Sequence, residues 1–366
     1  MKKKSNVYFV SSRILNKKGL LQKFSELLEY LKLDFIEQDD SVLIKTHFGE
    51  EGNTTFISPI FLRKLSDFIK KKNAHPFVGD TNTLYSGDRK QGVTHLELAL
   101  RHGFSYATLN APLVILDGIK SRHFKEIKIE GKHFDSVQLA GDYFASDAAV
   151  VVSHVKGHVL TAMGAAIKNL SMGLGTRTQK QRMHGDIKPQ IDHEKCILCQ
   201  NCVRVCPENA ISVVNNKIKI DLEKCIGCAE CITMCPTNAL KILWNEKPQN
   251  TAEKMSETAY AAVRQKKGKI YFFNFLTNIT PDCDCLGWSD NSLVNDIGLL
   301  ASQDPLAIDR ASLNLVNQQK ALPNSKAEKQ NSKILGRKDL DLDDMFEYCE
   351  CIGLGNREYE LIDLGW

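Results

Sequence analysis

The sequence predicts an α/β fold in which helices cover a mostly parallel sheet and a cysteine-rich α+β module is inserted into the chain. Short apolar runs alternate with longer amphipathic segments, as expected when helices connect parallel strands. Eight of the twelve cysteines fall within residues 196–235, where that alternation stops before resuming further on. We therefore expect a first host segment (1–189), an insert (190–245) and a second host segment (246–366).

The first host segment alternates predicted strands and helices. Its helices carry apolar residues at intervals of three and four, for example Leu20, Phe24 and Leu27. Pro59 marks the start of one helix and Gly103 the end of another. Strands are predicted at residues 7–10, 42–44, 77–78, 113–116 and 148–152, helices at 20–31, 58–69, 93–103 and 162–172, and a hairpin at 127–131. Buried strands separated by helices favour a sheet covered on both faces.

The second host segment resumes the same pattern. A helix is predicted at residues 252–264, because Gly268 follows it, and another helix begins at Asp304-Pro305. Strands are predicted at 270–273 and 297–300, a polar surface loop at 317–333, and a last helix from Leu340 before a tail that ends at Trp366.

Composition and charge restrict the class of protein. Apolar residues make up 43% and charged residues 25% of the 366, which is typical of soluble globular proteins. The 48 basic and 44 acidic residues give a net charge of +4, too small to indicate nucleic-acid or anionic-membrane binding. No apolar run is long enough for a signal peptide or a membrane span. We expect a cytoplasmic protein.

The inserted module contains the pattern C-x2-C-x2-C-x3-C-P twice, at residues 196–207 and 225–236. Such spacing lets three cysteines of one motif bind one [4Fe-4S] cluster, while the fourth reaches the neighbouring cluster. A zinc ribbon uses paired cysteines, and disulfides are rare in a reducing compartment. We predict two [4Fe-4S] clusters, the first bound by Cys196, Cys199, Cys202 and Cys235, and the second by Cys225, Cys228, Cys231 and Cys206.

The module resembles the bacterial two-cluster ferredoxin from Asp192 to Leu243. Between the motifs, residues 211–214 and 217–220 flank two asparagines and predict a hairpin, and residues 239–243 are expected to be its partner. The resemblance implies one-electron transfer.

Polar residues follow several predicted strands of the host. Ligands bind beyond the carboxyl ends of parallel strands, so these side chains should face one crevice. They are Lys45, Thr46, His47, Asp80, Thr81, Asn82, Asp117, residues 153–158 and Asn274. Loop residues are often polar without having a function, and this alternative explanation applies to the polar residues that stand alone after a strand. His154, Lys156 and His158 suit an anionic or metal-bound substrate. The catalytic candidates are His154, Lys156, His158, Lys45, His47 and Asp80.

Three further groups have a predicted role or position. Lys168 and Asn169 lie shortly before the glycine-bearing basic segment 173–182, which is either an anion-binding loop or a solvated charged loop. Cys283 and Cys285 either chelate a third metal, cycle as a dithiol, or are simply buried. Cys349 shares a helical stripe with Leu342, Met345 and Phe346 and should lie in the core, whereas Cys351 is out of phase and has no assigned role.

Three stretches resemble the uncharacterised iron-sulfur centre proteins whose host domain is called domain of unknown function 362. They are residues 153–158 with 164–169, residues 274–285, and residues 296–309. The resemblance extends over nearly the whole chain, and it implies a ferredoxin module inserted at the same place. It implies no substrate.

These observations favour an iron-sulfur redox protein, and an oxidoreductase if it is an enzyme. Two clusters would pass electrons to or from a host site near His154, Lys156, His158, Cys283 and Cys285. The expected partners are a redox protein and an anionic small molecule. Two alternatives are a non-enzymatic electron carrier or cluster-delivery protein, and an enzyme that binds an anionic ligand and has structural clusters.

Overall fold

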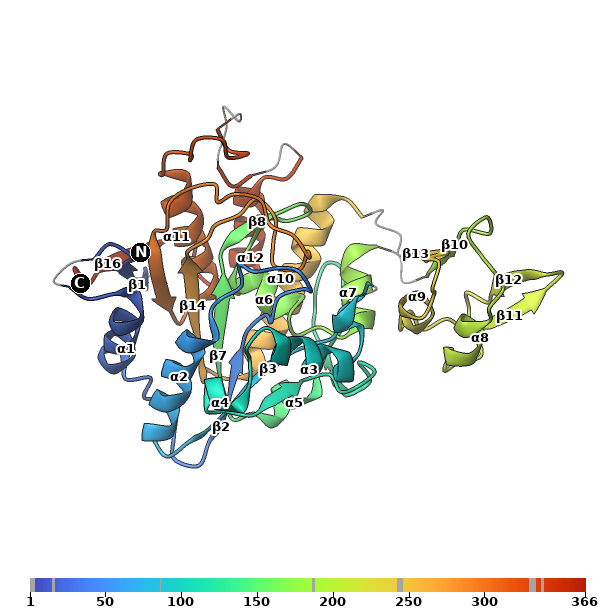
Figure 1. Cartoon of the computed structure of the whole chain (residues 1–366), viewed down its shortest axis with the longest axis horizontal. Helices are drawn as coiled ribbons and strands as arrows, with labels where there is room; N and C mark the ends of the chain where they lie inside the picture. The colour runs from blue at the N-terminus through green and yellow to red at the C-terminus, as the bar shows by residue number, and fades with distance from the viewer. Residues whose placement is uncertain are drawn as a thin grey trace.

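An eight-stranded sheet forms the centre of the protein (Figure 1). The computed structural model describes residues 4–14, 17–85, 87–185, 188–241, 246–328, 334–336 and 339–366. The strands lie in the order β16-β1-β15-β14-β7-β2-β3-β4. Their bounds are β1 (Ser5–Ser11), β2 (Ser41–Lys45), β3 (His75–Asp80), β4 (Leu113–Ile115), β7 (Ala148–His154), β14 (Ile270–Leu276), β15 (Gly298–Ser302) and β16 (Tyr359–Asp363).

The sheet is mixed and mostly parallel, which confirms that part of the predicted fold class. β14, β7, β2, β3 and β4 are parallel to one another, and β1 is parallel to β16. Only β15, among the described strands of this sheet, runs against its neighbours β1 and β14. The predicted C-terminal tail contains β16, which pairs with β1 at the edge. Sequence pattern missed β16 because an exposed edge strand needs no apolar alternation.

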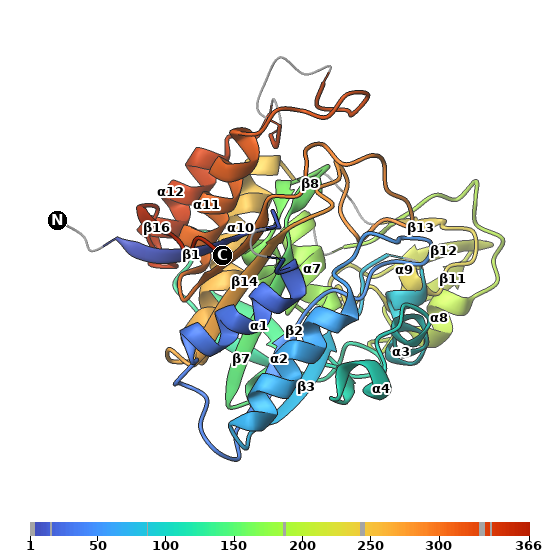
Figure 2. The same ribbon diagram turned by 60° about the vertical axis from the view of Figure 1, so that its left-hand side comes forward.

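Helices cover both faces of the sheet. On the central strand β7, Val150 and Val152 face one core, and Ala149 and Val151 face the other. The first core is covered by α1 (Leu20–Leu31), α2 (Pro59–Lys71) and α4 (Tyr106–Leu109), and the second by α6 (Ala166–Ser171), α10 (Pro248–Gln265), α11 (Pro305–Asn317) and α12 (Leu342–Cys351) (Figure 2). Smaller elements are η1 (Asp88–Lys90), α3 (Gly92–Arg101), α5 (Gly141–Ala145) and α7 (Arg177–His184). No described helix is both long and apolar enough to cross a membrane.

The segment between residues 124 and 184 differs from its prediction in three places. The hairpin is formed by β5 (Phe124–Lys128) and β6 (Ser136–Ala140), so its turn is longer than predicted. The helix predicted from residue 162 begins only at Ala166, because β9 (Ala162–Gly164) pairs with β8 (Lys156–His158). Residues 177–184 are helix α7 instead of a loop, because the Thr176 side chain caps the helix by accepting from the Gln179 amide.

A small lobe, residues 190–241, projects from one side of the sheet (Figure 1). It contains β10 (Gln190–Ile191), α8 (Asn201–Val205), β11 (Ile211–Val214), β12 (Lys217–Ile220), α9 (Glu230–Thr233) and β13 (Leu240–Lys241). The predicted hairpin is confirmed as β11 and β12. The predicted partner strand is wrong in its pairing, because β13 pairs with β10, which enters the lobe beside it. Residues 242–243 of that prediction lie outside the described residues.

The predicted surface loop at 317–333 is only partly exposed. Helix α11 extends to Asn317, and residues 318–328 contain no helix or strand. Ser325 and Ala327 are buried, and Lys326 forms an ion pair with Asp282 at 3.2 Å. The loop therefore covers the segment around residue 282. Residues 329–333 of the prediction lie outside the described residues.

Asp309 on α11 is a buried carboxylate that joins three elements. It accepts hydrogen bonds from the backbone amides of Ala166 and Ile167, each at 2.9 Å, and from Asn274 Nδ2 at 2.8 Å. Asn274 was predicted to face the crevice, but it is buried with Asp309 because this register of β14 points it into the helix layer. Burial raises the pKa of Asp309 to about 6, although its hydrogen bonds oppose the rise.

Asp309→Asn should change how stability depends on pH. A carboxyl whose folded pKa is raised contributes stability below its unfolded pKa, near 3.8, and this contribution is lost as pH rises through about 6. The free energy of unfolding of the wild type, relative to Asp309→Asn, should therefore fall by a few kcal/mol, on the order of two pKa units, between pH 4 and 7. Urea denaturation across this range measures it. Asp34→Asn, at an exposed carboxylate, should follow the wild type.

Candidate functional site

A cavity of about 510 Å³ lies at the carboxyl ends of β2, β3 and β7. This is where the sequence analysis expected a crevice. The predicted residues that line it are Thr46, His47, Asp80, Thr81, Ser153, His154, Lys156, His158, Lys168 and Asn169, together with Cys283 and Cys285. Four of the predicted polar residues do not line it: Asn274 is in the helix layer, Lys45 lies behind the cavity wall, and Asp117 is buried with Asn82, whose Nδ2 donates to it at 2.8 Å.

Lys45 lies behind the cavity wall and forms an ion pair with Asp80. Its Nζ donates to Asp80 Oδ1 and to Asn169 Oδ1, both at 2.8 Å. Burial favours the neutral form of Asp80, but Lys45 and the other basic groups around this carboxylate together outweigh burial and hold the pKa of Asp80 well below its usual range. A Cβ at Gly173 would lie 2.8 Å from Lys45 Nζ and 2.1 Å from the Asn169 carbonyl oxygen, so only glycine leaves room for this contact.

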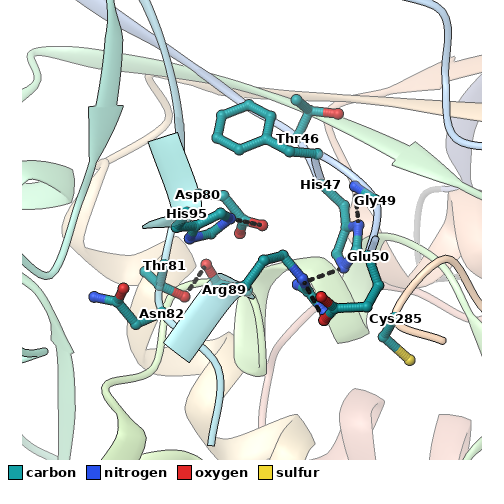
Figure 3. A network of polar contacts seen from close by, with 12 residues as sticks. Thr46, His47, Gly49, Glu50, Asp80, Thr81, Asn82, Arg89, His95 and Cys285 are labelled. Carbon is teal, nitrogen blue, oxygen red and sulfur yellow. Dashed lines mark hydrogen bonds and ion pairs between the residues drawn. The ribbon is translucent and has the colours of Figure 1, made fainter. Parts of the chain in front are cut away.

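Arg89 lines the cavity and contacts three other side chains near it (Figure 3). Its Nε donates to Glu50 Oε2 at 3.0 Å, one terminal nitrogen lies 2.8 Å from His47 Nε2, and the other donates to the Tyr85 hydroxyl at 2.5 Å. Burial and the charge of Arg89 hold the pKa of His47 well below its ordinary value, so His47 is neutral. Arg89, Glu50 and Tyr85 lie in irregular segments or a 3-10 turn, and no sequence motif marked them.

Asp284 binds two of the predicted basic residues. It lies 2.8 Å from His154 Nδ1 and accepts from Lys156 Nζ at 2.5 Å, and Lys156 also donates to Thr55. Burial opposes ionisation of Asp284, but His154 and Lys156 hold the pKa of its carboxyl well below the ordinary value. The cationic segment 154–158 is therefore partly neutralised by the residue between the two cysteines.

Cys283 and Cys285 are joined by a disulfide at the cavity wall. The structure thus contains the oxidised form of the pair, not two free thiols available for chelation. Lys168 Nζ lies 3.5 Å from Cys283 Sγ, and the Tyr85 hydroxyl donates to the Cys285 carbonyl oxygen at 2.9 Å. The pair is held between a cation and the Arg89 network.

His158, Cys283 and Cys285 form a possible metal site, because one ligand atom of each lies within 4.8 Å of the others. The hydrogen bonds of His158 favour another role in the oxidised protein. Its Nδ1 accepts from the backbone amides of Leu160 and Thr161, at 3.2 and 3.1 Å. Neutral His158 therefore carries its proton on Nε2, which makes that nitrogen a donor and not a metal ligand.

The basic segment 173–182 is not a solvated charged loop, which was one of its two predicted alternatives. Lys180 is buried, and its ammonium donates to Thr81 Oγ1, the Asn82 carbonyl and the Gly175 carbonyl at 2.6 to 2.8 Å. Arg177 is also buried, and it contacts the small lobe. Both cations are packed against protein oxygens, and Lys180 also lines the large cavity.

The eight cysteines of the small lobe surround two small cavities. Each cavity takes three cysteines from one motif and the last cysteine from the other, as the motif spacing predicts. One cavity is lined by Cys196, Cys199, Cys202 and Cys235, and the other by Cys206, Cys225, Cys228 and Cys231.

The two halves of the lobe repeat the same backbone. Leu198 and Gln200 have positive φ on either side of Cys199, and Gly227 and Ala229 do so on either side of Cys228. These left-handed residues turn each loop tightly around its cavity. The sulfurs of Cys206 and Cys235 each accept a backbone amide at 3.2 Å, from Ala210 and Ala239 respectively. Four sulfurs per cavity, with amides directed at sulfur, fit a four-iron cluster.

Arg177 and Leu84 connect the small lobe to the host. Arg177 donates to Glu230 Oε1 at 2.7 Å and to Thr233 Oγ1 at 3.3 Å, and both side chains of the ion pair are almost fully buried. Leu84 lines the large cavity and also belongs to the hydrophobic cluster that contains Cys202 and Cys231. The large cavity and the cysteine-lined lobe are therefore adjacent.

The remaining two cysteines lie apart from these sites. Cys349 is fully buried and its thiol donates to Ser256 Oγ at 3.0 Å, which confirms its predicted core position. Cys351 is exposed at the end of α12.

Fold and site define an α/β protein with a mostly parallel sheet, a polar cavity at the carboxyl ends of its strands and a cysteine-rich lobe beside it. The chain belongs to the family described as "Domain of unknown function (DUF362)", whose model matches residues 42–314. A comparison with curated proteins gives no match.

Two solved structures are similar to the chain. One is a crystal structure of a protein from Thermotoga maritima, with 8% identity, a TM-score of 0.41, and coverage of 72% of this chain and 52% of that one. The other is the lactate racemase apoprotein from Thermoanaerobacterium thermosaccharolyticum, with 9% identity, a TM-score of 0.41, and coverage of 86% and 57%. The chain thus spans little more than half the length of either structure.

Proposed function

We propose that this chain is an iron-sulfur redox protein that binds two [4Fe-4S] clusters in a ferredoxin-like module, residues 190–245. The host, residues 1–189 and 246–366, provides the cavity with which electrons are exchanged. The observation that carries the proposal is the pair of cavities lined by four cysteines each, with the last cysteine exchanged between motifs. A cytoplasmic location and a redox partner protein belong to the same proposal.

The chemistry of the eight thiols supports cluster binding. Burial raises the pKa of Cys202, Cys228 and Cys231. Burial acts in the same direction on Cys235, but hydrogen bonds to its sulfur outweigh it and lower the pKa. Iron bound in these cavities would stabilise the thiolate form of each ligand. Bound in these cavities, the two clusters would supply one-electron transfer.

The contact between lobe and host supports electron exchange with the large cavity. Leu84 packs in the cysteine-containing cluster and lines the cavity, and the next residue, Tyr85, donates to the Cys285 carbonyl. Two consecutive residues therefore connect the cysteine-containing cluster to the Cys283–Cys285 pair. This pair is the proposed electron acceptor of the host when it is a disulfide, and the proposed electron donor when it is a dithiol.

Two side chains next to the disulfide suit its redox chemistry. Reduction breaks the Cys283–Cys285 bond, takes up two electrons and two protons, and leaves two thiols. The Lys168 ammonium, 3.5 Å from Cys283 Sγ, would stabilise a thiolate there. One ring nitrogen of His158 lies within 4.8 Å of the same sulfur. Oxidation reverses each of these changes.

Counting electrons tests the proposal. Anaerobically purified protein should accept about four electrons per chain in a reductive titration, one for each of two clusters and two for the disulfide. The double variant Cys283→Ser, Cys285→Ser should accept about two and keep its cluster absorbance. Cys351→Ser, at an exposed cysteine outside both sites, should behave as the wild type.

The titration also separates the alternatives. Uptake of about two electrons by both the wild type and the double variant would contradict a redox role for Cys283 and Cys285, and would favour a carrier or cluster-delivery protein. A colourless protein that contains zinc would contradict the whole proposal. Activity that persists with the clusters held in either oxidation state would favour an enzyme with structural clusters.

A further inference from the structure

The cations that line the large cavity differ in the hydrogen-bond partners that the protein provides for them. Arg89 uses all three of its nitrogen positions on Glu50, His47 and Tyr85. Lys180 donates to three oxygens, and Lys156 donates to Asp284 and Thr55. Each of these groups therefore already has at least two hydrogen-bond partners in the protein, and Arg89 and Lys156 each contact a carboxylate.

Lys168 is the exception. Across the described ranges, its ammonium has no oxygen acceptor, and its one hydrogen-bond partner is Cys283 Sγ at 3.5 Å. Gly164 leaves space beside it, because a Cβ there would touch the Lys168 side chain at 3.4 Å. An ammonium group in a cavity wall that donates to no carboxylate is costly, and a bound anion would reduce that cost. Burial and the charge of Arg89 lower the pKa of Lys168 to about 8, although the charges of Asp284 and Asp80 oppose the fall.

The outer part of the cavity is apolar. Val159, Leu160 and Leu286 line it, and Val159 is 55% exposed, which places it at the surface end. Met172 and Ile57 add apolar side chains to the lining. A volume of about 510 Å³ falls in the range of small-molecule sites.

We propose that the cavity binds a small amphiphilic monoanion, with its carboxylate or similar anionic group on the Lys168 ammonium and its apolar body against Val159, Leu160 and Leu286. This assigns a ligand class to the site of the proposed function, and it rests on that function for the role of Cys283 beside the anionic group. The recognition itself requires neither cluster nor disulfide chemistry.

A matched pair of dyes tests the inference by calorimetry on the anaerobic, cluster-containing protein. The dye 8-anilinonaphthalene-1-sulfonate is an apolar monoanion, and N-phenyl-1-naphthylamine is its uncharged counterpart. Lys168→Met should weaken binding of the sulfonate at least about tenfold, because a charged hydrogen bond is lost, and should change binding of the neutral dye less than about twofold. Lys64→Met, on an exposed part of α2, should bind both dyes as the wild type does.

Each other outcome decides the inference. Equal binding of the sulfonate by Lys168→Met and the wild type would overturn it, and so would a wild type that binds neither dye. If Lys168→Met loses both dyes, Lys168→Arg decides: retained sulfonate binding supports the site, and lost binding with the neutral dye retained refutes it.

Displacement of the sulfonate distinguishes two ligand types. Decanoate should displace the dye if the cavity accepts an aliphatic body, and 2-naphthoate should displace it if the cavity accepts an aromatic one. Displacement by neither would contradict a carboxylate ligand. A protein that accepts only two electrons but binds the sulfonate through Lys168 would refute the proposed redox role of Cys283 and Cys285 and leave the anion-binding inference intact.

Discussion

Cys235→Ser should remove iron from the cavity that is formed mainly by the other cysteine motif. Cys235 follows the second motif in sequence but lines the cavity of Cys196, Cys199 and Cys202. Iron content should therefore fall from about eight to about four atoms per chain, and the spectrum of the second cluster should persist. Iron and sulfide analysis with electron paramagnetic resonance, on anaerobic protein, measures this change.

Cys206→Ser provides the reciprocal experiment, since Cys206 lines the cavity of the second motif. Either variant should lose one cluster, and the residual spectrum should differ between them. Cys351→Ser is the control and should keep about eight irons. Loss of the cluster from the motif to which the mutated cysteine belongs in sequence would contradict the exchange of ligands.

Arg177→Met should loosen the small lobe from the host. The variant removes the buried ion-pair partner of the Glu230 carboxylate and leaves it only the more distant Arg122, at 3.9 Å; the Arg177 and Glu230 side chains are 2% and 3% exposed in the intact pair. Breaking a buried pair on one side costs about 3–5 kcal/mol. Urea denaturation should show this loss, and limited proteolysis should release the segment around residues 190–241 sooner than in the wild type.

The double variant Arg177→Met, Glu230→Met separates charge from packing. Removing both charges leaves no unpaired carboxylate, so most of the lost stability should return. Arg63→Met is a matched control, because its ion pair with Asp67 is exposed, and it should cost about 1 kcal/mol or less. A double variant no more stable than Arg177→Met would show that the other Arg177 contacts, with Thr233 and the Lys90 carbonyl, dominate.

Prediction from sequence succeeded where a local pattern reflects burial. The central strands β2, β7 and β14 are buried on both faces, so their apolar runs were visible, and the helices around them show one apolar stripe each. Edge strand β16 was missed because its pairing partner, β1, lies at the other end of the chain. The β8–β9 hairpin was missed because each strand has only three residues and shows no apolar alternation.

The candidate site was predicted only in part. Residues at strand ends, such as His47, Asp80 and His154, could be assigned to one edge because parallel strands end together. Arg89 and Glu50 could not, since they reach the cavity from loops whose path is set by tertiary packing. Asn274 was placed wrongly because the side of the sheet that a strand residue faces depends on register.

The sequence by itself determined the alternation of strands and helices and the doubled cysteine motif, because both arise from residues close together in the chain. Only the tertiary structure decided which cations remain available in the cavity. Lys45, Lys156, Lys168 and Lys180 are chemically alike in sequence, but folding surrounds three of them with oxygen acceptors and leaves Lys168 beside a sulfur. The physical reason is that hydrogen-bond partners come from distant segments, whose positions no local pattern specifies.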